Sequence, residues 1–519
     1  MNSNDQAPTP LRRPFSIFLV AFFGLFFLSW PTVLSLDLWV FKDRGSFLNL
    51  DTLLGQHLRL GVDAYYSYGL LPVWIQHLLF RVFGAGYGPL LGCTVVTIAL
   101  MALFWALLLR HLPAERIWLM AIVALCPIVI WINPNFPYSL VQLSMLFALW
   151  LVLENRLAAA FAVSMVGCLS VPSLTLVLSF FIFLLILVNW WTGGERKAGT
   201  LARQIAPGLV TYAIGAALLA WVFGTSSFVA SALPLLGMQF YKAVHYGTIG
   251  ALLEFLHPSG QSFKYLVLYY AGTPVTWWVL ATLLLFYFGV RSAAAVWAEK
   301  RIQPKHAVVL ISALLQAIFA FHGYGVPGQE IVYSPWLLAA VLVGASQLPN
   351  EIFRKGIVFL LAAIGLLGTA AQARRTLIDW RTSVKNADTA NLYAHADWVK
   401  DWSDVLQLSR DHKVFLFSYG TGQHHYFPSV ESPNVWFVRT GQMFPADKQR
   451  VLSQLQNAEI VVEDLGGATS FIDYDPDVQR YLGQMCLTDV TTNFQVWRKA
   501  SIPPRNAVCK QNPRSKYRE

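Results

Sequence analysis

Residues 157–191 read LAAAFAVSMVGCLSVPSLTLVLSFFIFLLILVNWW, and none of them is charged. A helix needs about 20 apolar residues to cross a bilayer, so this stretch is too long for one spanning helix. Pro172 and Ser173 stand near its middle, where a tight turn would divide it. The stretch therefore predicts two consecutive spanning helices, and with them an integral membrane protein.

The same apolar pattern extends over most of the chain. Of its 519 residues, 56% are hydrophobic and only 13% are charged, whereas about a quarter of the residues in a typical globular domain are charged. We predict an all-α polytopic membrane domain over residues 1–373, with about eleven spanning helices. Their expected ranges are 15–36, 87–109, 117–133, 138–153, 157–171, 174–191, 205–224, 265–290, 306–321, 331–348 and 356–373.

The chain has a net charge of +10, and the positions of its basic residues indicate how it is oriented in the membrane. Lys and Arg gather in alternate short loops, which is typical of cytoplasmic loops. The N-terminus is then cytoplasmic, and eleven spans place the C-terminal tail outside. Arg374 and Arg375 directly follow the last span, so an error of one helix would reverse the side of the tail. We expect membrane lipids as partners, and no nucleic acid.

The absence of any Asn-x-Ser/Thr sequon favours a bacterial source, and hence the inner membrane of a bacterium. Two outer segments, 37–86 and 225–264, are too long to be simple connectors, and such loops are usually functional. Within the first, residues 46–60 and 73–83 place apolar side chains at helical spacing. Helices of this kind lie in the membrane interface.

The tail predicts a small extracytoplasmic α/β domain over residues 374–504, followed by a polar, basic and disordered end at 505–519. Cys486 and Cys509 could form a disulfide if this tail lies outside the cytoplasm. We expect helices at 392–408, 446–457 and 475–484, and strands at 414–418, 459–462, 487–491 and 494–498.

His424 and His425 follow the first predicted strand of the tail. The side chains of adjacent residues diverge on most backbones, so a metal site is not expected at this pair.

Asp43 is the candidate for chemistry, because it follows the first span within Trp39-Val40-Phe41-Lys42-Asp43-Arg44. A carboxylate at the outer membrane surface can reach both the head group of an amphiphile and water-soluble material. The alternative is a helix cap, or a loop charge paired with Lys42 or Arg44.

Tyr65, Tyr66 and Tyr68 stand beside a Tyr-Gly-x-x-Pro turn in the first outer loop. Their rings offer stacking surfaces with hydroxyl groups, as sugar-binding sites do. Tyrosines are also ordinary residues of the membrane interface, which is the alternative interpretation.

These features together resemble the GT-C glycosyltransferase superfamily. They are an acidic residue after the first span, an amphipathic helix, and a Gly-x-x-x-Tyr…Tyr-Gly-x-x-Pro stretch leading to a second interfacial helix. The chain is similar to the branch that contains protein O-mannosyltransferases and the aminoarabinose transferases acting on lipid A. In architecture the resemblance extends over the whole chain, whereas in motif it is limited to residues 37–90. The resemblance implies an inverting hexosyl or pentosyl transferase with a polyprenyl-phosphate sugar as donor.

The resemblance also implies that the acidic residue of the first loop is the catalytic base or holds a metal. Asp43 is the matching position in this chain. The sequence departs from the branch with paired acidic residues, because Arg44 follows Asp43. A divalent metal is therefore doubtful, and no other cofactor is implied.

The departing phosphate of such a donor needs cationic partners. Lys242 and His245 are three residues apart, so a helix would place them on one side, and we expect this pair to hold the phosphate with Arg44 and Arg59. A solvated interfacial helix is the alternative. Weaker candidates for substrate contact lie in or beside a glycine-rich outer loop, namely His322 and Glu330.

The acceptor could be a glycan, a lipid or a protein of the cell envelope. Three other functions fit parts of the pattern. A transporter or flippase for an amphiphile predicts charges within the helices and internal repeats. An O-antigen-ligase-like enzyme should depend on Arg and His of the outer loops, and a non-catalytic envelope protein should not need Asp43.

Overall fold

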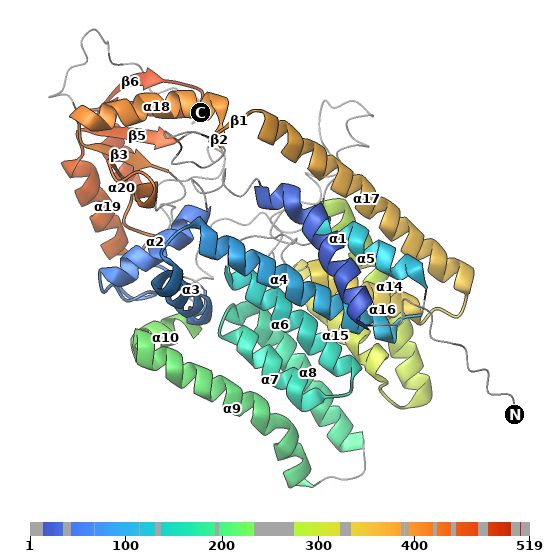
Figure 1. The fold of residues 1–519 in the computed structure, drawn as a ribbon. Helices are drawn as coiled ribbons and strands as arrows, with labels where there is room; N and C mark the ends of the chain where they lie inside the picture. The colour runs from blue at the N-terminus through green and yellow to red at the C-terminus, as the bar shows by residue number, and fades with distance from the viewer. Residues whose placement is uncertain are drawn as a thin grey trace, which may run out of the picture.

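The structure, a computed structural model, consists of a helical bundle with a small α/β domain at one end (Figure 1). It describes residues 14–34, 43–66, 68–113, 115–129, 136–192, 197–232, 274–321, 334–385, 389, 394–418, 423–436, 443–464, 476–499 and 509.

Each predicted span overlaps a helix, and residues 265–273 of the predicted span 265–290 lie outside the described residues. These helices are α1 (Pro14–Leu34), α4 (Tyr87–Leu108), α5 (Arg116–Val129), α6 (Phe136–Leu153), α7 (Leu157–Cys168), α8 (Pro172–Thr192), α9 (Ala198–Phe223), α14 (Pro274–Glu299), α15 (Pro304–Phe321), α16 (Ser334–Ser346) and α17 (Glu351–Arg381). By length and composition, five helices of the described chain suffice to cross a membrane. The polytopic helical fold is confirmed, and the number of eleven spans stays a prediction.

The charge-free stretch forms the predicted hairpin. Helix α7 ends at Cys168, and Pro172 begins α8, where its missing N–H costs nothing. Small residues allow the two helices to approach closely. Ser179 donates a hydrogen bond to Ser164 at 2.8 Å, and Gly167 lies directly against Thr175. Such contacts hold helices together in lipid, where apolar burial alone drives no association.

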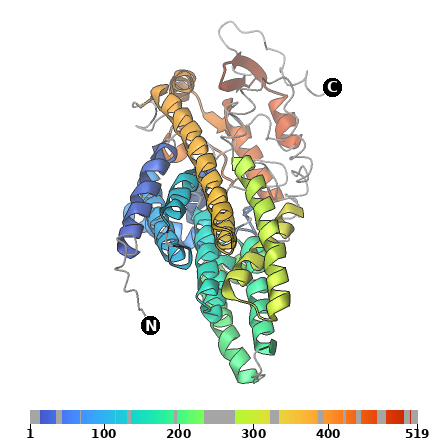
Figure 2. The same cartoon turned by 90° about the vertical axis from the view of Figure 1, so that its right-hand side faces the viewer.

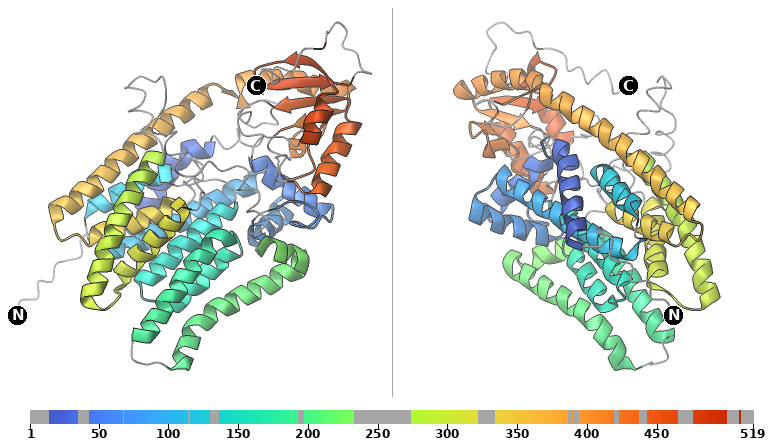
Figure 3. Two further views of the ribbon diagram at one scale, coloured as in Figure 1. Left: turned by 180° about the vertical axis from the view of Figure 1, so that it is seen from behind. Right: turned by 45° about the vertical axis from the view of Figure 1, so that its right-hand side comes forward.

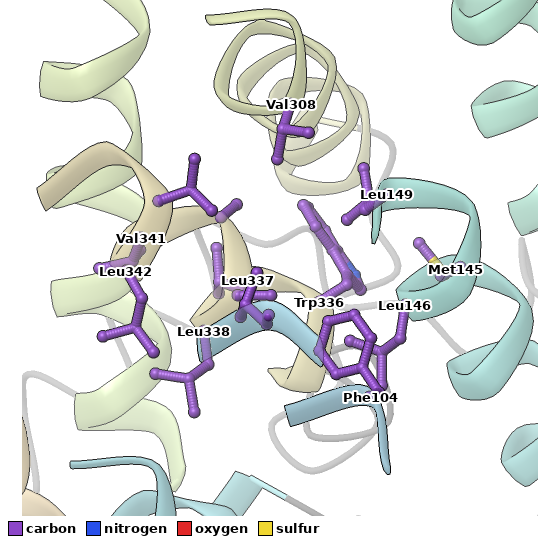
Figure 4. Packing of buried hydrophobic residues seen from close by; sticks show 14 of the residues in the cluster. Phe104, Met145, Leu146, Leu149, Val308, Trp336, Leu337, Leu338, Val341 and Leu342 are labelled. Atoms are coloured by element: carbon purple, nitrogen blue, oxygen red, sulfur yellow. The ribbon is translucent and has the colours of Figure 1, made fainter. Parts of the chain in front are cut away.

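Helix α16 lies in the centre of the bundle. Every residue from 335 to 345 is buried. Trp336 lies among Phe104 of α4 and Leu149 of α6, and Val308 of α15 approaches from the other side (Figure 4). A helix that is apolar all round belongs in such a core.

Helix α17 carries the chain from the bundle to the C-terminal domain (Figures 1 and 2). It has 31 residues, so it is about 46 Å long, while the hydrocarbon core of a bilayer is about 30 Å thick. The helix thus runs past position 373 without a break, and Arg374 and Arg381 lie on its exposed final turns. These charges do not require a further span.

The first turns of α17 hold a group of ion pairs. Arg354 contacts Glu115 at 3.2 Å, and Lys355 pairs with Glu351. These residues lie at the opposite end of α17 from the C-terminal domain. These charges and the α/β domain therefore lie at opposite ends of the bundle. The orientation of the chain in the membrane stays a prediction.

The C-terminal domain is the small α/β domain that was predicted, and it is built on one five-stranded sheet. Its strands are β3 (Val414–Phe417), β4 (Val430–Glu431), β5 (Ile460–Asp464), β6 (Cys486–Val490) and β7 (Phe494–Arg498), in the order β4-β3-β5-β7-β6. Strands β4, β3 and β5 are parallel, and β7 pairs antiparallel with β5 and β6. A separate pair of short strands, β1 (Ser383–Val384) and β2 (Ala394–His395), precedes this sheet.

Alternating side chains bury the two faces of the sheet. Helix α18 (Ala396–Asp411) covers one face, with Trp402 against Leu416 and Val462. Helices α19 (Pro445–Asn457) and α20 (Pro476–Leu482) cover the other, where Phe415 and Val461 are buried. Cys486 and Cys509 form a disulfide, which ties the end of the chain to β6.

Candidate functional site

The first outer loop folds into two helices at the end of the bundle that carries the C-terminal domain. They are α2 (Asp43–Gly55) and α3 (Leu70–Phe83), and α10 (Thr225–Ala232) lies beneath them (Figures 1 and 3). Asp43 is the first residue of α2, where a carboxylate interacts favourably with the helix dipole. The side chains of Asp43 and Arg44 lie outside the described residues.

Helix α3 holds α2 through two polar contacts. The Gln76 amide donates to the carbonyl oxygen of Phe47 at 2.6 Å, and Gln76 is buried. One turn further along α2, the Asp51 carboxylate lies 2.7 Å from Nδ1 of His77. The two bonded pairs join the two segments that were predicted to be interfacial helices. Helices α2 and α3 therefore form a hairpin, in which α3 fixes α2 from one side.

The C-terminal domain holds α2 from another side. The Asn49 side chain is 0% exposed and donates to the carbonyl oxygens of Pro433 and Val435, at 3.2 and 2.8 Å. Directly after the end of the helix, the Gln56 side chain accepts a hydrogen bond from Asn434. The segment 423–436 is therefore the part of the domain that contacts α2.

Two histidines complete this contact. His424 and His425 stack with ring centroids 4.5 Å apart, and their Nε2 atoms lie 3.2 and 3.0 Å from Oγ1 of Thr52. The expectation that their side chains diverge was wrong, because the short 3-10 helix η6 (Gln423–His425) turns both rings toward α2. Burial and the neighbouring His425 lower the pKa of His424 to about 4, and burial also lowers the pKa of His425.

These shifts predict that acid weakens the docking of the C-terminal domain. His424 has a folded-state pKa below its unfolded value of about 6.5, so its contribution is fully present above pH 6.5 and is lost as the pH falls toward 4. Asp51 faces the pair and raises the pKa of His425, and its carboxylate is itself bonded to Nδ1 of His77. Because solvent screens these partly exposed rings, we expect the protein to lose about 1 kcal/mol of stability between pH 7 and pH 5.

The measurement is the melting temperature at pH 5 and pH 7.5. His424→Asn should flatten the difference, and His412→Asn is the matched control, because His412 pairs with Glu459 away from α2. An acid sensitivity that is the same in both variants would contradict the assignment to His424.

The three predicted tyrosines surround one indole of the C-terminal domain. Trp436 is 1% exposed, and its ring centroid lies 6.0 Å from Tyr65, 5.0 Å from Tyr66 and 5.4 Å from Tyr68. Phe47 of α2 contacts the same indole. Tyr65 and Tyr66 are buried, and Tyr68 is half-buried. The structure brings the tyrosines together in a protein interface, with Tyr68 at its rim.

Charged side chains reinforce the same interface. The predicted phosphate ligand Arg59 forms a bidentate ion pair with Asp63, at 2.7 and 2.9 Å. From the C-terminal domain, Arg450 donates to the carbonyl oxygen of Asp63 at 3.0 Å and pairs with the buried Asp447. Asp447 in turn accepts from the backbone N–H of Tyr65 at 2.8 Å. The turn between α2 and α3 is thus bonded to α19.

The Tyr-Gly-x-x-Pro turn lies against the α7–α8 hairpin. The backbone N–H of Gly69 donates to the carbonyl of Ser170 at 2.7 Å, and that of Leu71 donates to Leu169 at 3.1 Å. A Cβ atom on Gly69 would lie 2.1 Å from the carbonyl oxygen of Leu169. The glycine of the motif is thus required by the close approach of two backbones.

The remaining predicted residues, Lys242, His245, His322 and Glu330, lie outside the described residues. Within the described part of the chain, no group of three or more His, Cys, Asp or Glu could hold a metal ion. Sequence reasoning missed Asn49, Trp436 and the role of the two histidines. Each is an isolated residue without a motif. Its role becomes visible only in the contact between the first loop and a segment nearly 400 positions later.

No family model matches the chain, and no curated protein matches it significantly. In structure it is similar to ArnT from Cupriavidus metallidurans bound to undecaprenyl phosphate, at 13% sequence identity and a TM-score of 0.51, covering 93% of this chain and 97% of that one. It is also similar to ArnT from the same organism in the apo state, at 13% identity and a TM-score of 0.50, covering 93% and 98% of the two chains. The chain therefore shares the fold of these two structures.

Proposed function

We propose that this chain is a GT-C-type glycosyltransferase that takes a sugar from a polyprenyl-phosphate donor. The observation that carries the proposal is a fold shared along 93% of the chain with a protein solved with undecaprenyl phosphate. A second support is the position of Asp43, which begins α2 at the end of the bundle that carries the C-terminal domain. The donor lipid would lie in the bilayer beside this end.

The proposed reaction inverts the anomeric carbon. A hydroxyl oxygen of the acceptor attacks that carbon and forms the new glycosidic bond, while the bond from the carbon to the phosphate oxygen breaks. The Asp43 carboxylate accepts the proton of the attacking hydroxyl, as a general base does. The electron pair of the broken bond leaves with the polyprenyl phosphate, which therefore gains one negative charge.

Cations near the departing phosphate would stabilise this charge. We assign Lys242 and His245 to it, together with Arg44 and Arg59. Arg59 is 54% exposed and already forms an ion pair with Asp63, so a phosphate would compete with the Asp63 carboxylate for it. Among the tyrosines, Tyr68 is the best placed for a sugar, because Tyr65 and Tyr66 are enclosed around Trp436. His322 and Glu330 are assigned to the acceptor side.

We place the protein in the bacterial inner membrane, with the N-terminus in the cytoplasm and the C-terminal domain in the periplasm. The separation of the charged loops from the α/β domain supports this orientation. The acceptor is then a glycan, a lipid or a protein of the envelope. No metal takes part in the proposed mechanism.

The test uses the full-length protein in nanodiscs with undecaprenyl phosphates that carry a hexose, a pentose or an amino-pentose. The acceptors are envelope fractions from a strain that lacks the gene. We expect one donor to be consumed, with release of undecaprenyl phosphate only when the acceptor is present, as measured by mass spectrometry. Donor that crosses the bilayer of proteoliposomes without losing its sugar would support a flippase instead. Consumption of lipid diphosphate donors alone would support an enzyme of the O-antigen-ligase type.

A further inference from the structure

The contacts of α2 with the C-terminal domain follow one stripe of the helix. Asn49, Thr52 and Gln56 are three and four residues apart, so they lie on the same face. Each of them bonds to the segment 423–436. The stripe runs from the middle of α2 to Gln56, directly after its last residue, Gly55. It therefore holds the second half of the helix and limits the rotation of α2 about its axis and its movement along it.

The segment that grips this stripe is itself held rigidly within its domain. Gln454 of α19 accepts from the backbone N–H of Asn434 at 2.9 Å and donates to the carbonyl of Ser432 at 3.2 Å. Strand β4, which lies within the segment 423–436, pairs with β3 in the sheet. The carbonyl groups that receive Asn49 are therefore fixed to the core of the α/β domain.

Asn49 is the central contact. It is 0% exposed, and its amide donates to two carbonyl oxygens that come from a segment 384 and 386 positions away. A buried amide bonded in this way tolerates little displacement, because each bond weakens steeply as its geometry departs from the ideal. Asn49 follows Asp43 by six residues, or about 9 Å along the helix axis.

We infer that the segment 423–436 is a positioning clamp for the proposed catalytic carboxylate, with Asn49 and Thr52 as its positioning residues. The inference rests on the proposed function. The clamp fixes the rotation and axial place of α2, and the helix transmits that placement to its first residue, Asp43. A displacement of about 1 Å at a reacting group can lower a rate by about 100-fold.

The inference predicts that Asn49→Ala lowers kcat by about 10- to 100-fold while KM for the donor stays unchanged. Thr52→Val, which keeps the shape of the side chain and removes its hydroxyl, should have a smaller effect in the same direction. The matched control is Leu487→Ala. Leu487 is buried in β6, at the opposite edge of the sheet from β4, so this variant weakens the C-terminal domain away from the segment 423–436.

Two measurements on the full-length protein in nanodiscs decide the matter. The first is kcat and KM per folded enzyme, with whichever undecaprenyl-phosphate sugar the wild type consumes. The second is hydrogen–deuterium exchange of residues 43–55, which needs no substrate. We expect faster exchange of α2 in Asn49→Ala and Thr52→Val, and wild-type exchange in Leu487→Ala.

Unchanged exchange of α2 in Asn49→Ala would overturn the inference, and so would an equal loss of kcat in Leu487→Ala. A wild type that consumes none of the donors would refute the proposed function instead. In that case the exchange measurement still decides whether the segment 423–436 clamps α2, so the two failures are distinguishable.

Discussion

Asp43→Asn is expected to lower the rate of sugar transfer by about 100- to 10,000-fold, because the amide cannot accept the proton of the attacking hydroxyl. Binding of undecaprenyl phosphate should be unaffected, since Asp43 acts on the acceptor. Asp43 is the first residue of α2, and an acidic residue at a helix N-terminus contributes only about 0.3–1 kcal/mol to stability. The variant should therefore fold and insert normally while losing turnover.

The measurement is the release of undecaprenyl phosphate from the active donor, together with the envelope glycans of a deletion strain that carries each variant. Asp404→Asn is the matched control, with the same chemical change on an exposed position of α18. Full transfer activity in Asp43→Asn would leave the residue as a helix cap only. It would also favour the non-catalytic envelope protein or a different base.

Gly69→Ala is expected to destabilise the protein by about 3 kcal/mol, at the upper end of the usual cost of overpacking. The new Cβ would lie 2.1 Å from the carbonyl oxygen of Leu169, 2.5 Å from its carbon and 2.9 Å from the nitrogen of Ser170. All three are backbone atoms, so no side-chain rotation can relieve the contact. Gly69 has φ −68°, which any residue adopts, so the effect comes from space and not from backbone strain.

The melting temperature of the full-length protein in detergent measures this effect. Gly55→Ala is the matched control, because a Cβ at Gly55 meets nothing within 4 Å. We expect Gly55→Ala to melt within a few degrees of the wild type and Gly69→Ala to melt well below it. Equal melting temperatures for the two variants would show that the first loop does not lie against the α7–α8 turn.

The helices of the bundle were predictable because lipid imposes a simple rule on the sequence. A chain in hydrocarbon must satisfy its own backbone and present apolar side chains, so each span appears as an apolar run. The hairpin of α7 and α8 followed from one charge-free stretch and a proline. The C-terminal elements followed from alternation and turn residues, although the two-residue strand β4 is too short to leave such a pattern.

The candidate site was predictable only where a motif marked it. The first loop was identified from its acidic residue, its tyrosines and its Tyr-Gly-x-x-Pro turn, and the structure places that turn against the α7–α8 hairpin. The tyrosines illustrate the limit of such reasoning. An exposed sugar platform and a buried interface need the same aromatic residues, and only the presence of Trp436 shows that Tyr65 and Tyr66 are enclosed.

Local composition is enough to show that the helices lie in lipid, where each of them stands in the chain, and that an α/β domain follows them. How the bundle and this domain meet depends on contacts between distant residues, so only the folded structure reveals it. Asn49, Thr52, His424 and Trp436 are ordinary residues in their own neighbourhoods. Their partners lie nearly 400 positions away, and the energy of a buried hydrogen bond depends on which atoms meet in space and not on the residues beside them in the chain.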